Sequence, residues 1–183
     1  VAERARGRSV PDAAATVADL RRWIAEPEAM GRTKPLQDLV LISWAAATNR
    51  TFRDHGGPAR VAIDQLADHL EVVAQPLPTD AVWGVARDRA ERIFGVPHLP
   101  DAPSANGLAR LSAALLDRSE AVRSDVAALP GSLIELGELV GDGGEWPRTA
   151  TARSAVALVD SILAAGDDLA RSEALAAAAV DPS

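Results

Sequence analysis

The side chains best suited to chemistry gather in one ten-residue segment, NRTFRDHGGP, at positions 49–58. The segment combines an amide, two guanidinium groups, a carboxylate and an imidazole with a Gly-Gly-Pro turn, directly after the most apolar run of the chain. Rigid scaffolds commonly present functional residues on such loops. We therefore predict an interaction loop whose residues are Asn49, Arg50, Arg53, Asp54, His55, Gly56 and Gly57.

The same segment also fits a purely structural corner. In that interpretation Phe52 anchors the core, and Arg50 and Arg53 pair with helix-end carbonyls or with Asp54. The two glycines then serve only to turn the chain. Residue types and spacing leave both interpretations open.

A metal centre is not predicted. The three histidines, His55, His69 and His98, have no partner at the spacing of the common zinc motifs. Asp54 and His55 could contribute two ligands to a composite site, but a solvated loop histidine is the simpler interpretation of this pair.

Motifs for catalysis are also missing from the sequence. The chain has no cysteine, no GxSxG elbow and no GxxxxGK[ST] loop, and its one lysine, Lys34, lies in GRTK. Ser43 lies within the apolar run, where a hydroxyl usually bonds back to its own helix. We therefore predict no catalytic residue and no cofactor, and thus a protein that is not an enzyme.

The net charge and the hydropathy of the chain limit the kinds of partner that it is expected to bind. A formal net charge of −7 does not provide the basic face that phosphate contacts need, which argues against direct nucleic-acid binding. The longest apolar run is far shorter than the roughly 20 residues that cross a bilayer. We expect a cytoplasmic protein that works without a membrane, through protein partners or through other domains of a longer chain.

The elements that position the loop are predicted to be helices. Aromatic residues make up only 3% of the chain, so the core must be built from Leu, Val, Ile and Ala, which favours closely spaced helices. The predicted fold is all-α, with a multi-helix orthogonal core followed by an antiparallel helical hairpin or small bundle. The predicted parts are a disordered segment 1–9, a helical core 10–95, a proline-rich linker 96–104 and a C-terminal hairpin or bundle 105–180.

The fold prediction also specifies the structure of three segments. The apolar helix after Thr33 is expected to be central and packed on several sides, because only Ser43 is polar between Leu39 and Ala47. Apolar residues spaced i, i+3, i+4, i+7 predict an amphipathic helix over 60–73. Pro130-Gly131 is expected to interrupt the long helix that begins near Ser104.

The long helix carries a heptad-like pattern. Its apolar residues are spaced 3, 4, 7, 4 and 3, and they are Leu108, Leu111, Leu115, Val122, Val126 and Leu129. The sequence leaves open whether this face is covered internally or by another chain. Trp83 and Trp146 are candidate interface aromatics.

The middle of the chain resembles a known family. The run LISWAAATNRTFRDHGGP, the QPLP connection and the helix DAVWGVARDRAERIFGV resemble a helical region of the large P-loop ATPases of bacterial phage-defence systems, of the phage-growth-limitation and BREX type. The resemblance covers roughly residues 36–110. It implies a fragment of a larger ATP-driven defence protein whose eventual target is DNA. Because no Walker motif is present, it carries no ATP-binding residue over to this sequence.

These observations lead to two main hypotheses, with a nucleic-acid module that uses clustered arginines as a third. The leading one is a non-catalytic helical interaction domain, a fragment of a larger ATPase, that docks neighbouring domains or partner proteins. The alternative is a helical small-ligand sensor with an apolar pocket between its helices.

Overall fold

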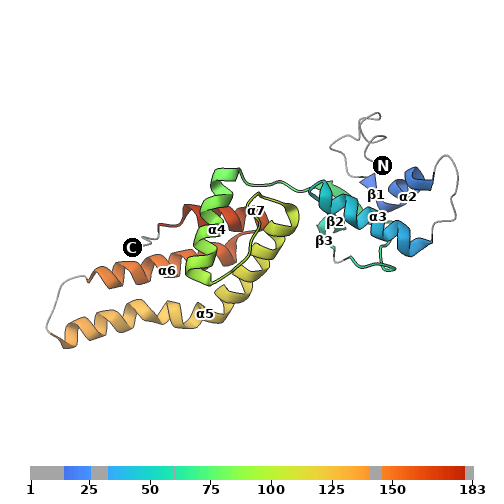
Figure 1. Cartoon of the computed structure of the whole chain (residues 1–183). Coiled ribbons are helices and arrows are strands. Elements are labelled where there is room, and N and C mark those ends of the chain that lie inside the picture. Colours follow the sequence, from blue (N-terminus) through green and yellow to red (C-terminus); the bar gives the residue numbers. More distant parts are fainter. Residues whose placement is uncertain (1–14, 26–32, 60, 141–145, 180–183) are drawn as a thin grey trace. The chain divides into compact units, whose positions relative to one another are not determined.

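The computed structural model describes residues 15–25, 33–59, 61–140 and 146–179, and these form two compact units (Figure 1). The first unit is Val1–Pro76 and the second is Leu77–Ser183. The predicted disordered segment 1–9 lies outside the described residues.

In the first unit, the residues that the structure describes form two helices and a small sheet. In chain order its elements are β1 (Ala15–Thr16), α2 (Val17–Ala25), α3 (Lys34–Ala47), β2 (Arg50–Asp54), β3 (Gly57–Pro58) and β4 (Glu71–Ala74). The strands form one four-stranded sheet in the order β1-β4-β2-β3, and every neighbouring pair is antiparallel. The structure is mostly helical, as predicted, but an all-α class is wrong for this unit.

The helix predicted over 60–73 is wrong, because residues 61–70 are irregular and β4 begins at Glu71. Asp64 has a φ of +70°, which a continuing helix excludes, and the chain becomes a strand at Glu71. Val72 is fully buried and lies opposite Phe52 in the β2–β4 register, so an apolar cross-strand pair fixes this strand. Leu66 and Leu70 do reach the core, but from irregular backbone.

The apolar helix α3 is buried on one side only. Leu41 and Ala45 face the core, whereas Leu36 and Leu39 are exposed, so the predicted packing on several sides is wrong. Helix α2 buries one face, because Val17, Leu20 and Ile24 all lie in the core. The core of the first unit is formed by α2, α3, β2, β4 and the segment 61–70.

The described residues of the second unit form four helices. They are α4 (Asp80–Phe94), α5 (Ala105–Leu139), α6 (Pro147–Ala164) and α7 (Asp168–Ala177). Helix α4 begins where the Thr79 hydroxyl accepts a hydrogen bond from the Val82 N–H, and it ends at Gly95, which has a φ of +60°. The sequence itself predicts both ends, with Thr79 as the capping residue and Gly95 as the stop.

Helix α5 continues through Pro130, so the predicted interruption at Pro130-Gly131 is wrong. Proline deprives a helix of one backbone hydrogen bond, but α5 packs along α6 and keeps its helical course (Figure 1). Helices α5 and α6 pack closely through small residues. The buried ones are Ser119 and Gly137 of α5 and Thr149 and Ala152 of α6.

Helix α4 packs with the helices that follow it. Its Trp83, Ala86 and Ala90 belong to one buried cluster with Leu108, Leu111 and Leu115 of α5. The sequence prediction placed α4 with the preceding residues, in a core spanning 10–95. The boundaries of independently folding domains stay a prediction.

Candidate functional site

The predicted interaction loop is a strand followed by a tight turn. His55 and Gly56 connect β2 to β3, and they have φ values of +47° and +84°. Two central residues with positive φ are typical of the two-residue hairpin turn that matches the twist of antiparallel strands. Of the two glycines at this turn, Gly56 has the positive φ.

The predicted loop residues do not all meet at one place. The Arg50 guanidinium lies 5.3 Å from the centroid of the Trp44 ring, at the α3 end of the strand. Asn49, with a φ of +52°, forms the corner between α3 and β2, and its carbonyl accepts a hydrogen bond from the Gln75 N–H at 2.9 Å. Asp54 and His55 lie at the other end of β2, next to Gly56 and Gly57.

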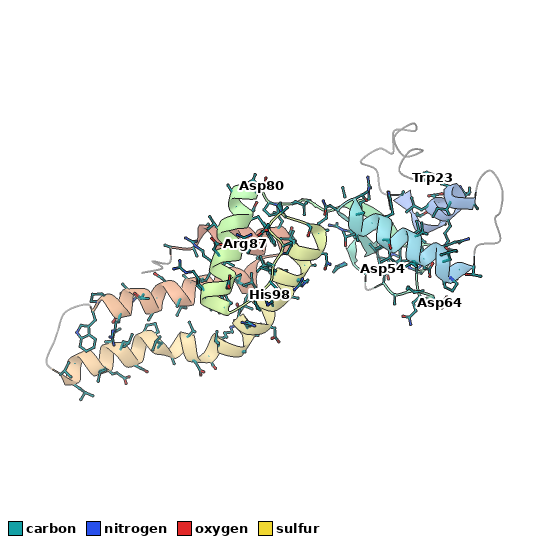
Figure 2. The ribbon with its side chains drawn as sticks, viewed as in Figure 1. Trp23, Asp54, Asp64, Asp80, Arg87 and His98 are labelled. Carbon is teal, nitrogen blue, oxygen red and sulfur yellow. The ribbon has the colours of Figure 1, made fainter. Side chains whose placement is uncertain are left out.

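One further residue, His69, lies at this turn, and the sequence prediction of the loop does not include it. The Nε2 atom of His69 lies 3.2 Å from Oδ1 of Asp54, and that of His55 lies 3.5 Å from the same oxygen. The two imidazole rings are stacked, with centroids 5.9 Å apart. Figure 2 labels Asp54 at this position. The β2–β4 register explains the meeting, because Arg53 pairs with Glu71 and the residues just beyond each strand end face one another.

A second candidate surface runs along α5. Six apolar residues spaced 4, 3, 4, 3 and 4 form a stripe on this helix, and they are Val122, Val126, Leu129, Leu133, Leu136 and Val140. Four of them, Val122, Leu129, Leu136 and Val140, are 38% to 61% exposed. The preceding heptad positions Leu108, Leu111 and Leu115 are fully buried. The heptad face is therefore covered internally in its first half and open to solvent in its second.

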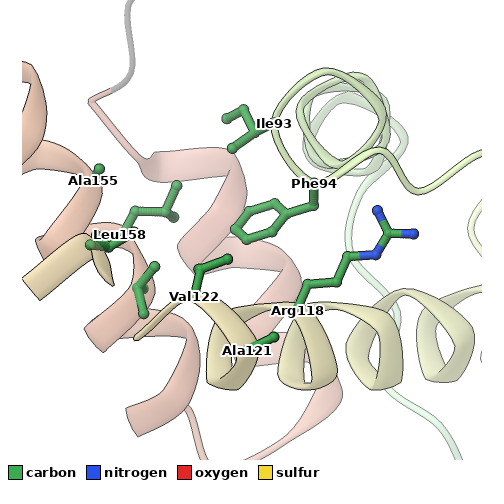
Figure 3. A pocket seen from close by; sticks show the side chains of 9 residues that line it. Ile93, Phe94, Arg118, Ala121, Val122, Ala155 and Leu158 are labelled. Carbon is green, nitrogen blue, oxygen red and sulfur yellow. The ribbon is translucent and has the colours of Figure 1, made fainter. Parts of the chain in front are cut away.

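A shallow pocket lies where the covered half meets the open half. Its volume is about 380 Å³, and it is lined by residues of α4, α5 and α6. Phe94 from α4 points into it beside Val122 of α5, with Leu158 of α6 opposite (Figure 3). Arg118 is the one charged residue of its lining, and Val122 and Val126 belong both to the pocket and to the stripe.

The two candidate aromatics differ in their surroundings. Trp83 is fully buried in the core of the second unit, and its Nε1–H donates a hydrogen bond to the Pro100 carbonyl at 2.9 Å. This position is in a core and not on a surface. Trp146 is half-buried and directly precedes α6.

Within the described ranges, no helix is long and apolar enough to cross a membrane.

Comparison with known families gives two matches. The model of the sixth domain of the BREX-system ATPase PglY protein matches residues 87–183, and the model of its fifth domain matches residues 1–45. The sixth-domain match covers the end of α4 and all of α5, α6 and α7. No solved structure matches the chain.

Proposed function

This chain belongs to the PglY family of BREX-system ATPases, and from that premise we propose that it is a non-catalytic docking region of a larger ATPase. The docking surface is the stripe on α5, from Val122 to Val140. Its occupant is an amphipathic helix from the remainder of the ATPase chain. The two matches, to fifth and sixth domains, support the view that the chain works as one part of a longer protein.

The exposed stripe is the observation that carries this proposal. Fully burying a leucine or valine side chain contributes about 1.5–3 kcal/mol, so a contiguous line of half-exposed ones is an unused source of binding free energy. The spacing of 4 and 3 residues is the pattern that receives a partner helix by knobs-into-holes packing.

The pocket lies at one end of this docking surface. Because Val122 and Val126 belong to both, the pocket and the stripe form one apolar surface. A helix lying on the stripe can insert one large apolar side chain between Phe94 and Leu158, as an anchor residue does at a protein interface.

The docking proposal predicts the effect of two charges on the stripe. We expect the double change Leu129→Glu and Leu136→Glu to weaken binding of this chain to the remainder of the ATPase by about 100-fold, because two desolvated carboxylates replace two apolar contacts. Biolayer interferometry with the two purified parts measures this directly. Both leucines are already partly exposed, so the folded chain should tolerate the changes.

A matched control places the same charges elsewhere on the same helix. Ala127 and Ala128 are exposed on a different face of α5, and Ala127→Glu with Ala128→Glu should leave binding within about threefold of the wild type. Equal binding by wild type, stripe variant and control would contradict docking through the stripe.

The pocket also favours a second candidate function, a small-ligand sensor. Its volume of about 380 Å³ lies in the range of small-molecule sites, and its single cation suits an apolar molecule with a carboxylate. Medium-chain fatty acids are the natural probes. For a sensor we expect decanoate to raise the melting temperature saturably, and Val122→Trp to abolish the shift by filling the pocket. A melting temperature that does not change with decanoate concentration would contradict this candidate.

A further inference from the structure

We infer that Asp54, His55 and His69 form a binding site for a divalent transition-metal ion of the zinc class. This site lies at the hairpin turn of the first unit and is independent of the proposed docking surface on α5. It revises the sequence prediction, which counted only two potential ligands there.

The distances between potential ligand atoms support the inference. Around a tetrahedral zinc ion with bonds of about 2.0–2.1 Å, neighbouring ligand atoms lie about 3.3–3.4 Å apart. Oδ1 of Asp54 lies 3.2 Å from Nε2 of His69 and 3.5 Å from Nε2 of His55. All three ligand atoms lie within 4.8 Å of one another. A small rotation of the imidazoles would therefore complete three edges of a tetrahedron.

The backbone holds the ligands in this arrangement. His55 occupies a turn position with a φ of +47°, where glycine or asparagine is the usual residue. His69 lies in the turn that leads into β4, and the pairing of β2 with β4 fixes it beside Asp54. The stacked rings of His55 and His69 place two imidazoles side by side at this turn.

The donor set selects the class of ion. Two imidazole nitrogens and one carboxylate oxygen suit zinc and neighbouring transition metals, whereas calcium and magnesium take oxygen ligands in larger number. Three protein ligands leave one position for water or for a side chain of a neighbouring protein. All three side chains are 48% to 91% exposed, so an ion could enter directly from solvent.

A bound ion would cross-link the sheet. It would join the β2–β3 turn to the segment before β4, which lies 14 residues further along the chain from His55. Because the strands have only two to five residues, this additional link should raise the stability of the first unit measurably.

A hydrogen bond between His69 and Asp54 explains the same contact without a metal. The two explanations differ in what happens when zinc is added. We expect the full chain, stripped with a chelator, to bind one Zn²⁺ per molecule by calorimetry and to gain several degrees in melting temperature. Co²⁺ should give the intense visible absorption of a tetrahedral site. Failure to bind zinc would overturn the inference.

Two matched variants assign the binding to this cluster. His69→Asn removes one ligand and should weaken zinc binding by at least about 100-fold, because even changes outside the ligand shell cost 10–100-fold. His98→Asn removes the third histidine of the chain, which lies in the second unit, and should bind zinc as the wild type does. Equal binding by both variants would overturn the assignment.

One further variant separates ligand loss from loss of folding. His55→Asn places asparagine at a positive-φ turn position that it adopts readily, so the hairpin should remain folded. We expect this variant to lose zinc binding and the Co²⁺ absorption while its melting temperature in chelator stays close to that of the wild type. Retained zinc affinity would exclude His55 as a ligand.

Discussion

Replacing Asp38 with alanine is expected to lower the free energy of unfolding of the first unit by about 3–5 kcal/mol. Asp38 lies on α3 and is fully buried. Its Oδ1 accepts a hydrogen bond from Nη2 of Arg21 at 2.5 Å, and the Arg21 side chain is itself only 14% exposed. Truncation would therefore leave a largely buried guanidinium charge without its buried counter-ion. Urea denaturation followed by circular dichroism measures the change.

Arg21 also provides the control for this prediction. It makes a second ion pair, with Asp68, whose side chain is 66% exposed. Because solvent screens that pair, Asp68→Ala should cost no more than about 1 kcal/mol. Arg21 additionally donates a hydrogen bond to the Leu66 carbonyl at 2.8 Å, and both variants retain that contact. An equal loss of unfolding free energy in Asp38→Ala and Asp68→Ala would show that burial does not determine the strength of these two ion pairs.

Helix α4 of the second unit is predictable because the signals at its two ends are local. Thr79 and Gly95 mark the two ends of α4 through hydrogen bonds and dihedral angles within one turn of the helix. The sheet gave no comparable signal. Its strands contain two to five residues, and the apolar spacing over 60–73 also satisfies the helical period. The pairing of Phe52 with Val72 decides the structure there, and that pair is distant in sequence.

The candidate sites were missed for related reasons. His69 meets Asp54 through the β2–β4 register, which the sequence does not show because the apolar spacing over 60–73 predicts a helix. On α5 the sequence predicts the heptad pattern only as far as Leu129, because Pro130 is expected to break the helix. Once the helix continues, Leu133, Leu136 and Val140 extend the same stripe. Because of Pro130, the sequence does not predict the second half of the proposed docking surface.

Replacing Trp83 with alanine is the second prediction with a large expected effect. Trp83 is fully buried in the cluster shared by α4 and α5, and its indole N–H bonds to the Pro100 carbonyl. Loss of a buried tryptophan leaves a cavity and costs about 3–5 kcal/mol, to which the unpaired carbonyl adds. We expect native-state hydrogen exchange of the α5 amides to accelerate by more than 100-fold, because their protection depends on this core.

The same experiment tests where one folding unit ends. If α4 belongs energetically to the second unit, Trp83→Ala should leave exchange of the α3 amides unchanged. Trp23→Ala, which removes a half-buried tryptophan packed on the core of the first unit, should have the reverse effect. If Trp83→Ala instead accelerates exchange in α3 and α5 equally, α4 contributes to a core that includes the preceding residues. That result would favour the predicted core over 10–95, because cooperative loss of protection defines a folding unit more directly than contacts do.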